Sequence, residues 1–179
     1  MIEGNSLYKF GALSSTPSSI VLRPAPITLG RCRRLDGWED RMAAVLHAAR
    51  RRPYRLGEHD CFSLACEMVE ALVGVDLWAP WAGSYSTLSE ARSRIADFGN
   101  YRRARGQRWS LDELVTSAAS RLFGSEPVPM ALGRRGDICE FVVERPHLGI
   151  IIGASAMMLG PEGLVAVPRE AGRHCWRIG

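Results

Sequence analysis

This chain of 179 residues has almost no lysine and no long apolar run. Lys9 is the only lysine among 23 basic residues, and the formal net charge is +4. So mild a charge does not by itself indicate an acidic partner. The most apolar stretch, residues 148–159, is shorter than the roughly 18 residues that a membrane span needs and contains Gly149 and Gly153. The N-terminus lacks the basic cluster and apolar run of a signal peptide, so we expect a protein made in the cytoplasm and not inserted into a membrane.

The cysteines are not paired in the sequence. There are five of them, an odd number, and no two have CxxC spacing, which argues against a disulfide framework and a zinc knuckle. The histidines and cysteines together lack metal-ligand spacing, and there is no Gly-rich phosphate loop. We therefore expect no metal and no cofactor. At least one thiol remains free, and its chemistry becomes the main question.

Arginines gather at one place beside a tryptophan. They are Arg102, Arg103, Arg105 and Arg108, next to Trp109. Guanidinium groups bind phosphates and aromatic rings stack on bases, so this patch could contact nucleic acid. A solvated loop between two helices explains the same residues, and we expect no nucleic-acid partner.

The chain divides into an arm and a domain. Residues 1–34 are rich in Ser, Thr and Pro, and Pro24 and Pro26 prevent a helix there. We expect an extended arm that makes assembly contacts, followed by one domain over residues 35–179.

Hydrophobic periodicity predicts an α+β domain with helices first and an antiparallel sheet afterwards. Asp36, Asp60, Thr87 and Ser110 are the candidate N-terminal caps. The expected helices are 37–51, 60–73, 89–98 and 110–123, and the expected strands are 137–143, 148–152, 156–159, 164–167 and 174–178.

Cys61 lies at the start of the second expected helix, behind a turn that contains Gly57. Unpaired N–H groups and the helix dipole stabilise a thiolate at such a position, so we expect the pKa of Cys61 to be lowered. A buried structural cysteine behind an Asp60 cap is the alternative.

A cysteine nucleophile needs a base. The histidines are His47, His59, His147 and His174, and His147 directly precedes an expected buried strand. Such a strand could pack against the Cys61 helix, so His147 is the candidate base.

At these motifs the sequence resembles the NlpC-type branch of the papain-like cysteine peptidases, over roughly residues 38–178. The family has a Pro-Tyr-x-x-Gly stretch before Asp-Cys, a Gly-Asp pair that opens the sheet, and a His followed by an apolar residue, Gly and Ile. The matching residues are Pro53, Tyr54, Gly57, Asp60, Cys61, Gly136, Asp137, His147, Leu148, Gly149 and Ile150. The compact turn before Cys61 and the terminal Trp176-Arg177 look like the small NlpC-like proteins of phage tails and gene transfer agents.

The resemblance implies a papain-like domain in which the Cys helix packs on an antiparallel sheet or half-barrel. It implies a cysteine peptidase or amidase that cleaves peptidoglycan stem peptides during cell-wall penetration. Cys61 and His147 would be catalytic, Tyr54 would line the oxyanion hole, and Asp60 could face a substrate ammonium group. The protein would be made in the host cytoplasm and carried in a virion tail or tail-like particle, where residues 1–34 would contact other tail-tip proteins.

The resemblance leaves the third catalytic residue open. The family's imidazole-orienting residue falls about a dozen positions after the histidine, where this chain has residues 157–159, Met-Met-Leu. His59 is a possible orienter, and Ser155 is another. A degenerate structural component of a tail tip is the alternative function, with Trp78, Trp81 and Tyr85 as a binding edge or a core lid. Acyl transfer would use the same Cys–His chemistry.

Overall fold

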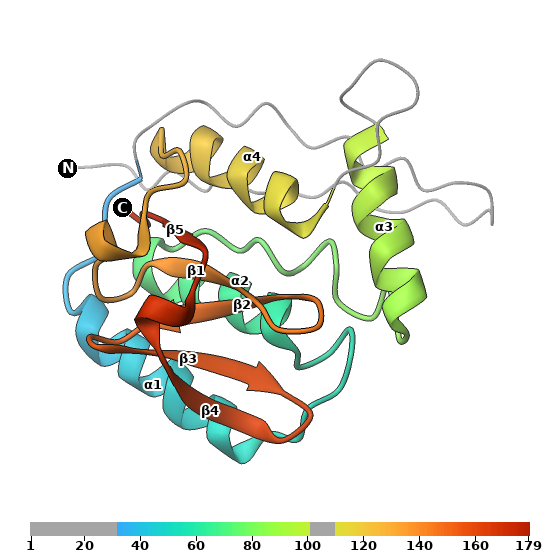
Figure 1. The fold of residues 1–179 in the computed structure, drawn as a ribbon, viewed down its shortest axis with the longest axis horizontal. Helices are drawn as coiled ribbons and strands as arrows, with labels where there is room; N and C mark the ends of the chain where they lie inside the picture. Colours follow the sequence, from blue (N-terminus) through green and yellow to red (C-terminus); the bar gives the residue numbers. More distant parts are fainter. Residues whose placement is uncertain (1–31, 101–109) are drawn as a thin grey trace, which may run out of the picture.

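The computed structural model describes residues 32–100 and 110–179, apart from the side chains of residues 98–100. In this part of the chain, four α-helices precede a five-stranded antiparallel sheet, which confirms the α+β class (Figure 1). The helices are α1 (Trp38–Arg51), α2 (Cys61–Val73), α3 (Leu88–Asn100) and α4 (Leu111–Phe123). The strands are β1 (Ile138–Val142), β2 (Pro146–Ile151), β3 (Ser155–Gly160), β4 (Gly163–Pro168) and β5 (His174–Trp176), with short 3-10 turns η1 (Met130–Leu132) and η2 (Arg169–Ala171).

Three of the four predicted caps are present. Asp60 and Ser110 each form a capping box, at the start of α2 and of α4. Before α3, the Thr87 N–H donates to the Glu90 carboxylate and the Glu90 N–H donates to the Thr87 hydroxyl, as in a capping box. The prediction for Asp36 is wrong, because Gly37, with φ 69°, occupies the N-cap of α1 and offers no side chain.

The sheet has the strand order β4-β3-β2-β1-β5, with β2 at its centre. Figure 1 shows α1 and α2 together on one face of this sheet. Leu148 and Ile150 of β2 pack there with Met68 of α2 and Met42 of α1 in one buried core, each no more than 1% exposed. This burial fixes α2 against β2 and so brings the start of the helix close to the start of the strand.

Residues 32–34, at the end of the predicted arm, make contacts with the domain. The Cys32 N–H donates to the Leu122 carbonyl, and Arg34 pairs with the buried carboxylate of Asp137 at 2.9 Å. Asp137 also accepts from the Ile178 N–H at 3.1 Å, so the predicted Gly-Asp motif joins both ends of the domain. The rest of the arm, residues 1–31, and the arginines near Trp109 lie outside the described residues. Among the helices of the described part, none has the length and apolarity to cross a membrane.

Candidate functional site

Asp60 organises the turn before Cys61. Its side chain is buried, and each carboxylate oxygen accepts two hydrogen bonds. Oδ1 accepts from the N–H groups of Phe62 and Ser63 at 3.0 and 2.9 Å, and Oδ2 accepts from the Gly57 N–H at 2.9 Å and the Tyr85 hydroxyl at 2.7 Å. Asp60 therefore has no free lone pair directed at a ligand, and its expected role facing a substrate ammonium group is not supported.

Gly57 is required where the turn meets the Tyr85 backbone. It has φ +75°, and a Cβ at this position would lie 1.8 Å from the Tyr85 carbonyl oxygen. The Gly57 carbonyl in turn accepts from the Gly83 N–H at 2.9 Å. The absent side chain thus allows the turn to pack directly on the following loop.

Cys61 is the first residue of α2 and is partly exposed. It lines a pocket of about 250 Å³ together with Tyr54 and His147, so the structure brings three predicted site residues together. Asp60 caps the two N–H groups that follow, those of Phe62 and Ser63, while the Cys61 N–H is directed at the Cys61 sulfur. This donor lies beside the nucleophile, where an oxyanion hole needs one.

The predicted lowering of the pKa of Cys61 is wrong for the unliganded protein. Burial raises the pKa of Cys61 to about 11, and the nearby Asp60 carboxylate adds to this effect. Hydrogen bonds from the backbone of Leu148 and of Cys61 itself, and the charge of Arg145, act in the opposite direction but are smaller than the burial effect. The resting group is therefore a thiol and not a thiolate.

His147 is the second residue of β2, opposite Phe141 of β1. Its neighbour Leu148 supplies the backbone hydrogen bond to Cys61, and both His147 and Cys61 line the same pocket. Burial and the nearby Arg145 lower the pKa of His147. A neutral imidazole next to a neutral thiol can act as a general base once a substrate is present.

The structure supplies no orienting residue from the predicted candidates. The Nδ1–H of His59 donates to the Pro53 carbonyl at 3.1 Å, and its Nε2 has no partner among the described residues, so it does not hold His147. Ser155 lies at the far end of the β2–β3 pair, where its carbonyl accepts from the Ile152 N–H. The pairing of β2 with β3 runs from Gly149 opposite Met158 to Ile151 opposite Ala156 and does not include His147.

Tyr54 is half-buried in the pocket wall. Burial, followed by the charges of Cys61 and Asp60, raises its pKa, so the hydroxyl stays protonated and remains a donor. This agrees with its expected place next to the reacting atoms.

The aromatic residues form a lid over the pocket. Phe62 packs edge-on against Trp81, with ring centroids 5.0 Å apart, and against Trp78 at 6.0 Å. Trp81 and Tyr85 are only 5% and 7% exposed, so they serve as a core lid and not as an exposed binding edge. The pocket walls are consequently apolar next to the thiol.

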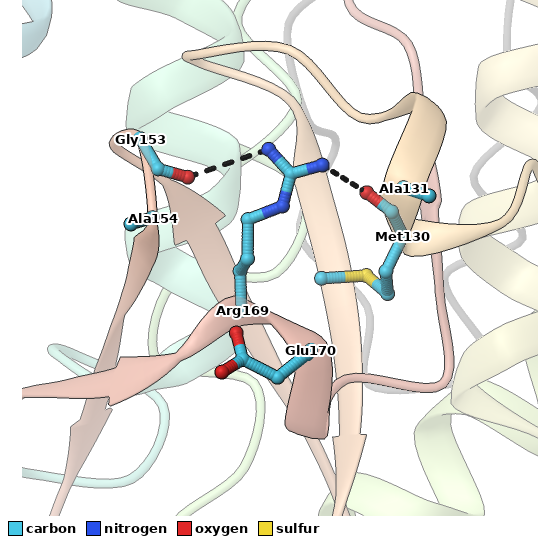
Figure 2. Close-up of a pocket in the computed structure, with 6 residues that line it drawn as sticks. All are labelled: Met130, Ala131, Gly153, Ala154, Arg169 and Glu170. Atoms are coloured by element: carbon cyan, nitrogen blue, oxygen red, sulfur yellow. Dashed lines mark hydrogen bonds between the residues drawn. The ribbon is translucent and has the colours of Figure 1, made fainter.

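A larger hollow, of about 570 Å³, lies beside η1 and η2 and shares no lining residue with the Cys61 pocket (Figure 2). Its arginine, Arg169, donates to the carbonyls of Met130 and Gly153 at 2.6 and 3.4 Å. The guanidinium of Arg169 is thus bound to backbone, and Glu170 is the other charged residue among those that line the hollow.

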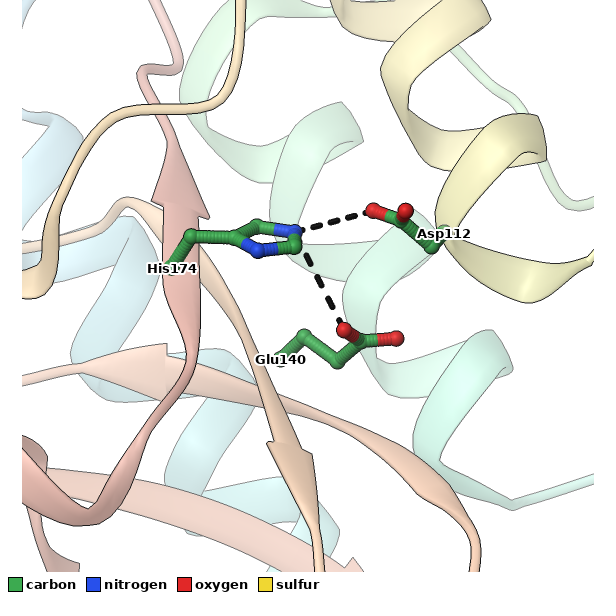
Figure 3. Close-up of side chains that lie close together, drawn as sticks. All are labelled: Asp112, Glu140 and His174. Atoms are coloured by element: carbon green, nitrogen blue, oxygen red, sulfur yellow. Dashed lines mark hydrogen bonds and ion pairs between the residues drawn. The ribbon is translucent and has the colours of Figure 1, made fainter.

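Sequence spacing missed a group of three potential metal ligands. His174 of β5 points its Nε2 toward Asp112 of α4, at 2.9 Å, and toward Glu140 of β1, at 3.9 Å (Figure 3). Because the three come from separate elements, no local motif could reveal them. Arg173 also contacts Glu140, at 3.4 Å. Together, these ion pairs link α4 to the sheet, which explains the cluster without a bound metal.

Comparison with known proteins gives one match. The family described as a domain of unknown function, DUF6950, covers residues 33–178. No curated protein and no solved structure matches the chain.

Proposed function

The chain belongs to the DUF6950 family, and from its pocket we propose that it is a cysteine hydrolase that cleaves an amide bond, with Cys61 as nucleophile and His147 as base. The observation that supports this most directly is the meeting of Cys61, His147 and Tyr54 in one pocket. These residues come from a helix start, a strand start and a turn that are far apart in the sequence.

The chemistry follows from the protonation states. As the Cys61 sulfur attacks the substrate carbonyl carbon, His147 takes the thiol proton, so no free thiolate has to form beforehand. The carbonyl oxygen gains negative charge next to the N–H of Cys61, with the Tyr54 hydroxyl as a second donor. His147 then returns the proton to the leaving amine, and water attacks the thioester to release the acid and regenerate the thiol.

The finer assignment is a papain-like, NlpC-type peptidase or amidase acting on peptidoglycan stem peptides. Its support is the residue pattern around Cys61, Asp137 and His147. We further propose that the protein acts in the tail or tail tip of a phage or tail-like particle, where residues 1–34 contact other tail-tip proteins. A variant lacking residues 1–30 should fail to enter such particles, and normal incorporation would contradict the role of the arm.

Digestion of purified peptidoglycan by the full chain tests the enzyme directly. New amino and carboxyl ends should appear with the native protein and be absent with Cys61→Ala. Cys32→Ala is the matched control, because it removes a partly buried thiol that does not line the pocket. Equal digestion by Cys61→Ala would contradict the assignment of the nucleophile.

A second candidate, a structural tail component that has lost catalysis, is favoured by one observation. The positions where the NlpC-type family has its orienter hold Met157, Met158 and Leu159, whose side chains carry no N or O atom. Under this alternative, particles carrying Cys61→Ala would infect as well as native particles. Under the hydrolase proposal, they would assemble normally but penetrate the cell wall less well.

A further inference from the structure

Two arginines line the Cys61 pocket without an acidic partner. Arg145 precedes β2 and Arg92 lies on α3, and both contribute to the pocket wall. Every acidic residue of the chain except Glu3 lies in the described part, and none of these described residues forms an ion pair with either guanidinium. Elsewhere in the domain, arginines do pair with carboxylates, as Arg52 does with Glu67 and Arg34 with Asp137.

The one acidic group of the pocket does not take this role. Asp60 is buried and its carboxylate accepts four hydrogen bonds from its own turn, from α2 and from Tyr85. The pocket therefore combines two unpaired cations with a single carboxylate that is already fully hydrogen-bonded. Such a site favours an anion over a cation.

We propose that the pocket selects a substrate with a carboxylate next to the scissile acyl group, and that Arg145 is the residue that determines this specificity. The inference rests on the proposed hydrolase function and narrows its substrate to anionic acyl compounds, such as peptides with a free carboxylate. A guanidinium binds a carboxylate through two parallel N–H donors, and the apolar lid strengthens this pairing by excluding water. Arg92, which is exposed and also lines the pocket, would add to the attraction.

The geometry places Arg145 close to the chemistry. It stands two residues before His147 in the chain and lines the same pocket as Cys61, His147 and Tyr54. The carboxylate would thus be held beside the reacting carbonyl, which orients the substrate and does not only attract it.

The test compares two reagents that differ in charge, N-ethylmaleimide and 3-maleimidopropionate, on the folded full chain at low salt. Modification of Cys61 is followed by peptide mass spectrometry, and the rate ratio is normalised to that of the chain unfolded in urea. We expect the folded protein to prefer the anionic reagent by about fivefold, and the preference to fall in about 0.5 M NaCl. Arg145→Gln should return the ratio to that of the unfolded chain. Arg121→Gln, which makes the same charge change in the last turn of α4 and outside the pocket, should leave it unchanged.

A folded-state ratio equal to the unfolded one would overturn the inference, as would an Arg145→Gln variant that keeps the preference or a Cys61 that neither reagent modifies. These outcomes test the charge preference of the pocket and not the proposed hydrolysis. If the preference holds and no amide substrate is cleaved, the proposed function fails while the anion site stands. If amides are cleaved without any charge preference, only the inference about Arg145 fails.

Discussion

Replacing Asp60 with alanine should destabilise the protein far more than the loss of a helix cap alone. The cap itself contributes about 1 kcal/mol to the free energy of unfolding. The substitution also leaves the buried Gly57 N–H and Tyr85 hydroxyl without their acceptor, which costs about 1–3 kcal/mol for each donor. Burial and the Asp60 charge raise the pKa of Tyr85, so its hydroxyl remains a donor that needs a partner. We expect a total loss of about 4 kcal/mol.

The chain offers a matched control for this prediction. Ser110 caps α4 in the same kind of box, but its bonds are exposed and it holds no tyrosine. Ser110→Ala should therefore cost only about 1 kcal/mol in urea unfolding followed by circular dichroism. Combining Asp60→Ala with Tyr85→Phe should cost less than the two single changes added together, because the orphaned hydroxyl is gone. If Asp60→Ala and Ser110→Ala differ by less than about 1 kcal/mol, the role of Asp60 as a buried junction is refuted.

Three further outcomes follow. Gly57→Ala should lower the free energy of unfolding by about 3 kcal/mol or prevent folding, because its Cβ would meet the Tyr85 carbonyl oxygen at a positive φ. Gly83→Ala, which is also at positive φ but has open space around it, should lower the free energy of unfolding by only about 1 kcal/mol. Equal losses in the two variants would contradict the packing argument. Burial and Asp112 raise the pKa of Glu140, so its ionised form destabilises the fold. In thermal unfolding, Glu140→Gln should therefore be more stable than the native protein at pH 7, and this difference in stability should shrink as the pH falls toward 5. A difference that grows on acidification would contradict the raised pKa. The rate at which iodoacetamide modifies Cys61 should follow an apparent pKa of about 11. At every pH below 11, the fully buried Cys139 should react more slowly than Cys61. Faster labelling of Cys139 would contradict the placement of Cys61 in an accessible pocket.

The local elements of the fold could be read from the sequence because their signals are local. The capping boxes at Asp60 and Ser110 and the glycine that ends α2 at Gly74 each involve residues within one turn of a helix. Asp36 failed as a cap because Gly37, which can adopt φ > 0, moved the start of α1 by one residue.

The sequence predicts which residues meet in the pocket, but not how their pKa values shift. Cys61 and His147 were found because each stands at the start of an element with a clear pattern. The rise of the pKa of Cys61 depends on burial beneath β2 and on the proximity of Asp60, which only the packed structure reveals. The bond from Tyr85 to Asp60 spans 25 residues, and no spacing rule could have predicted it.

The ring direction of His59 and the Asp112 cluster also depend on contacts that spacing in the sequence does not reveal. His59 has a suitable side chain, but the turn directs its ring to the Pro53 carbonyl. The sequence alone already places Met157, Met158 and Leu159 where the NlpC-type family has its orienter. His174 meets Glu140 through the pairing of β5 with β1, and it meets Asp112 through the packing of α4.

The pH dependence of Cys61 acylation by p-nitrophenyl acetate tests the neutral thiol–imidazole pair most directly. The measurement is the release of one equivalent of p-nitrophenolate, with acetylation of Cys61 confirmed by mass spectrometry. Because the pKa of His147 lies below its usual value and that of Cys61 is about 11, general-base attack should give a rate that is nearly constant between about pH 7 and 10 and is lost in His147→Ala. A rate that rises about tenfold per pH unit up to pH 11, and is the same in His147→Ala, would mean that a simple thiolate reacts and that His147 is no base.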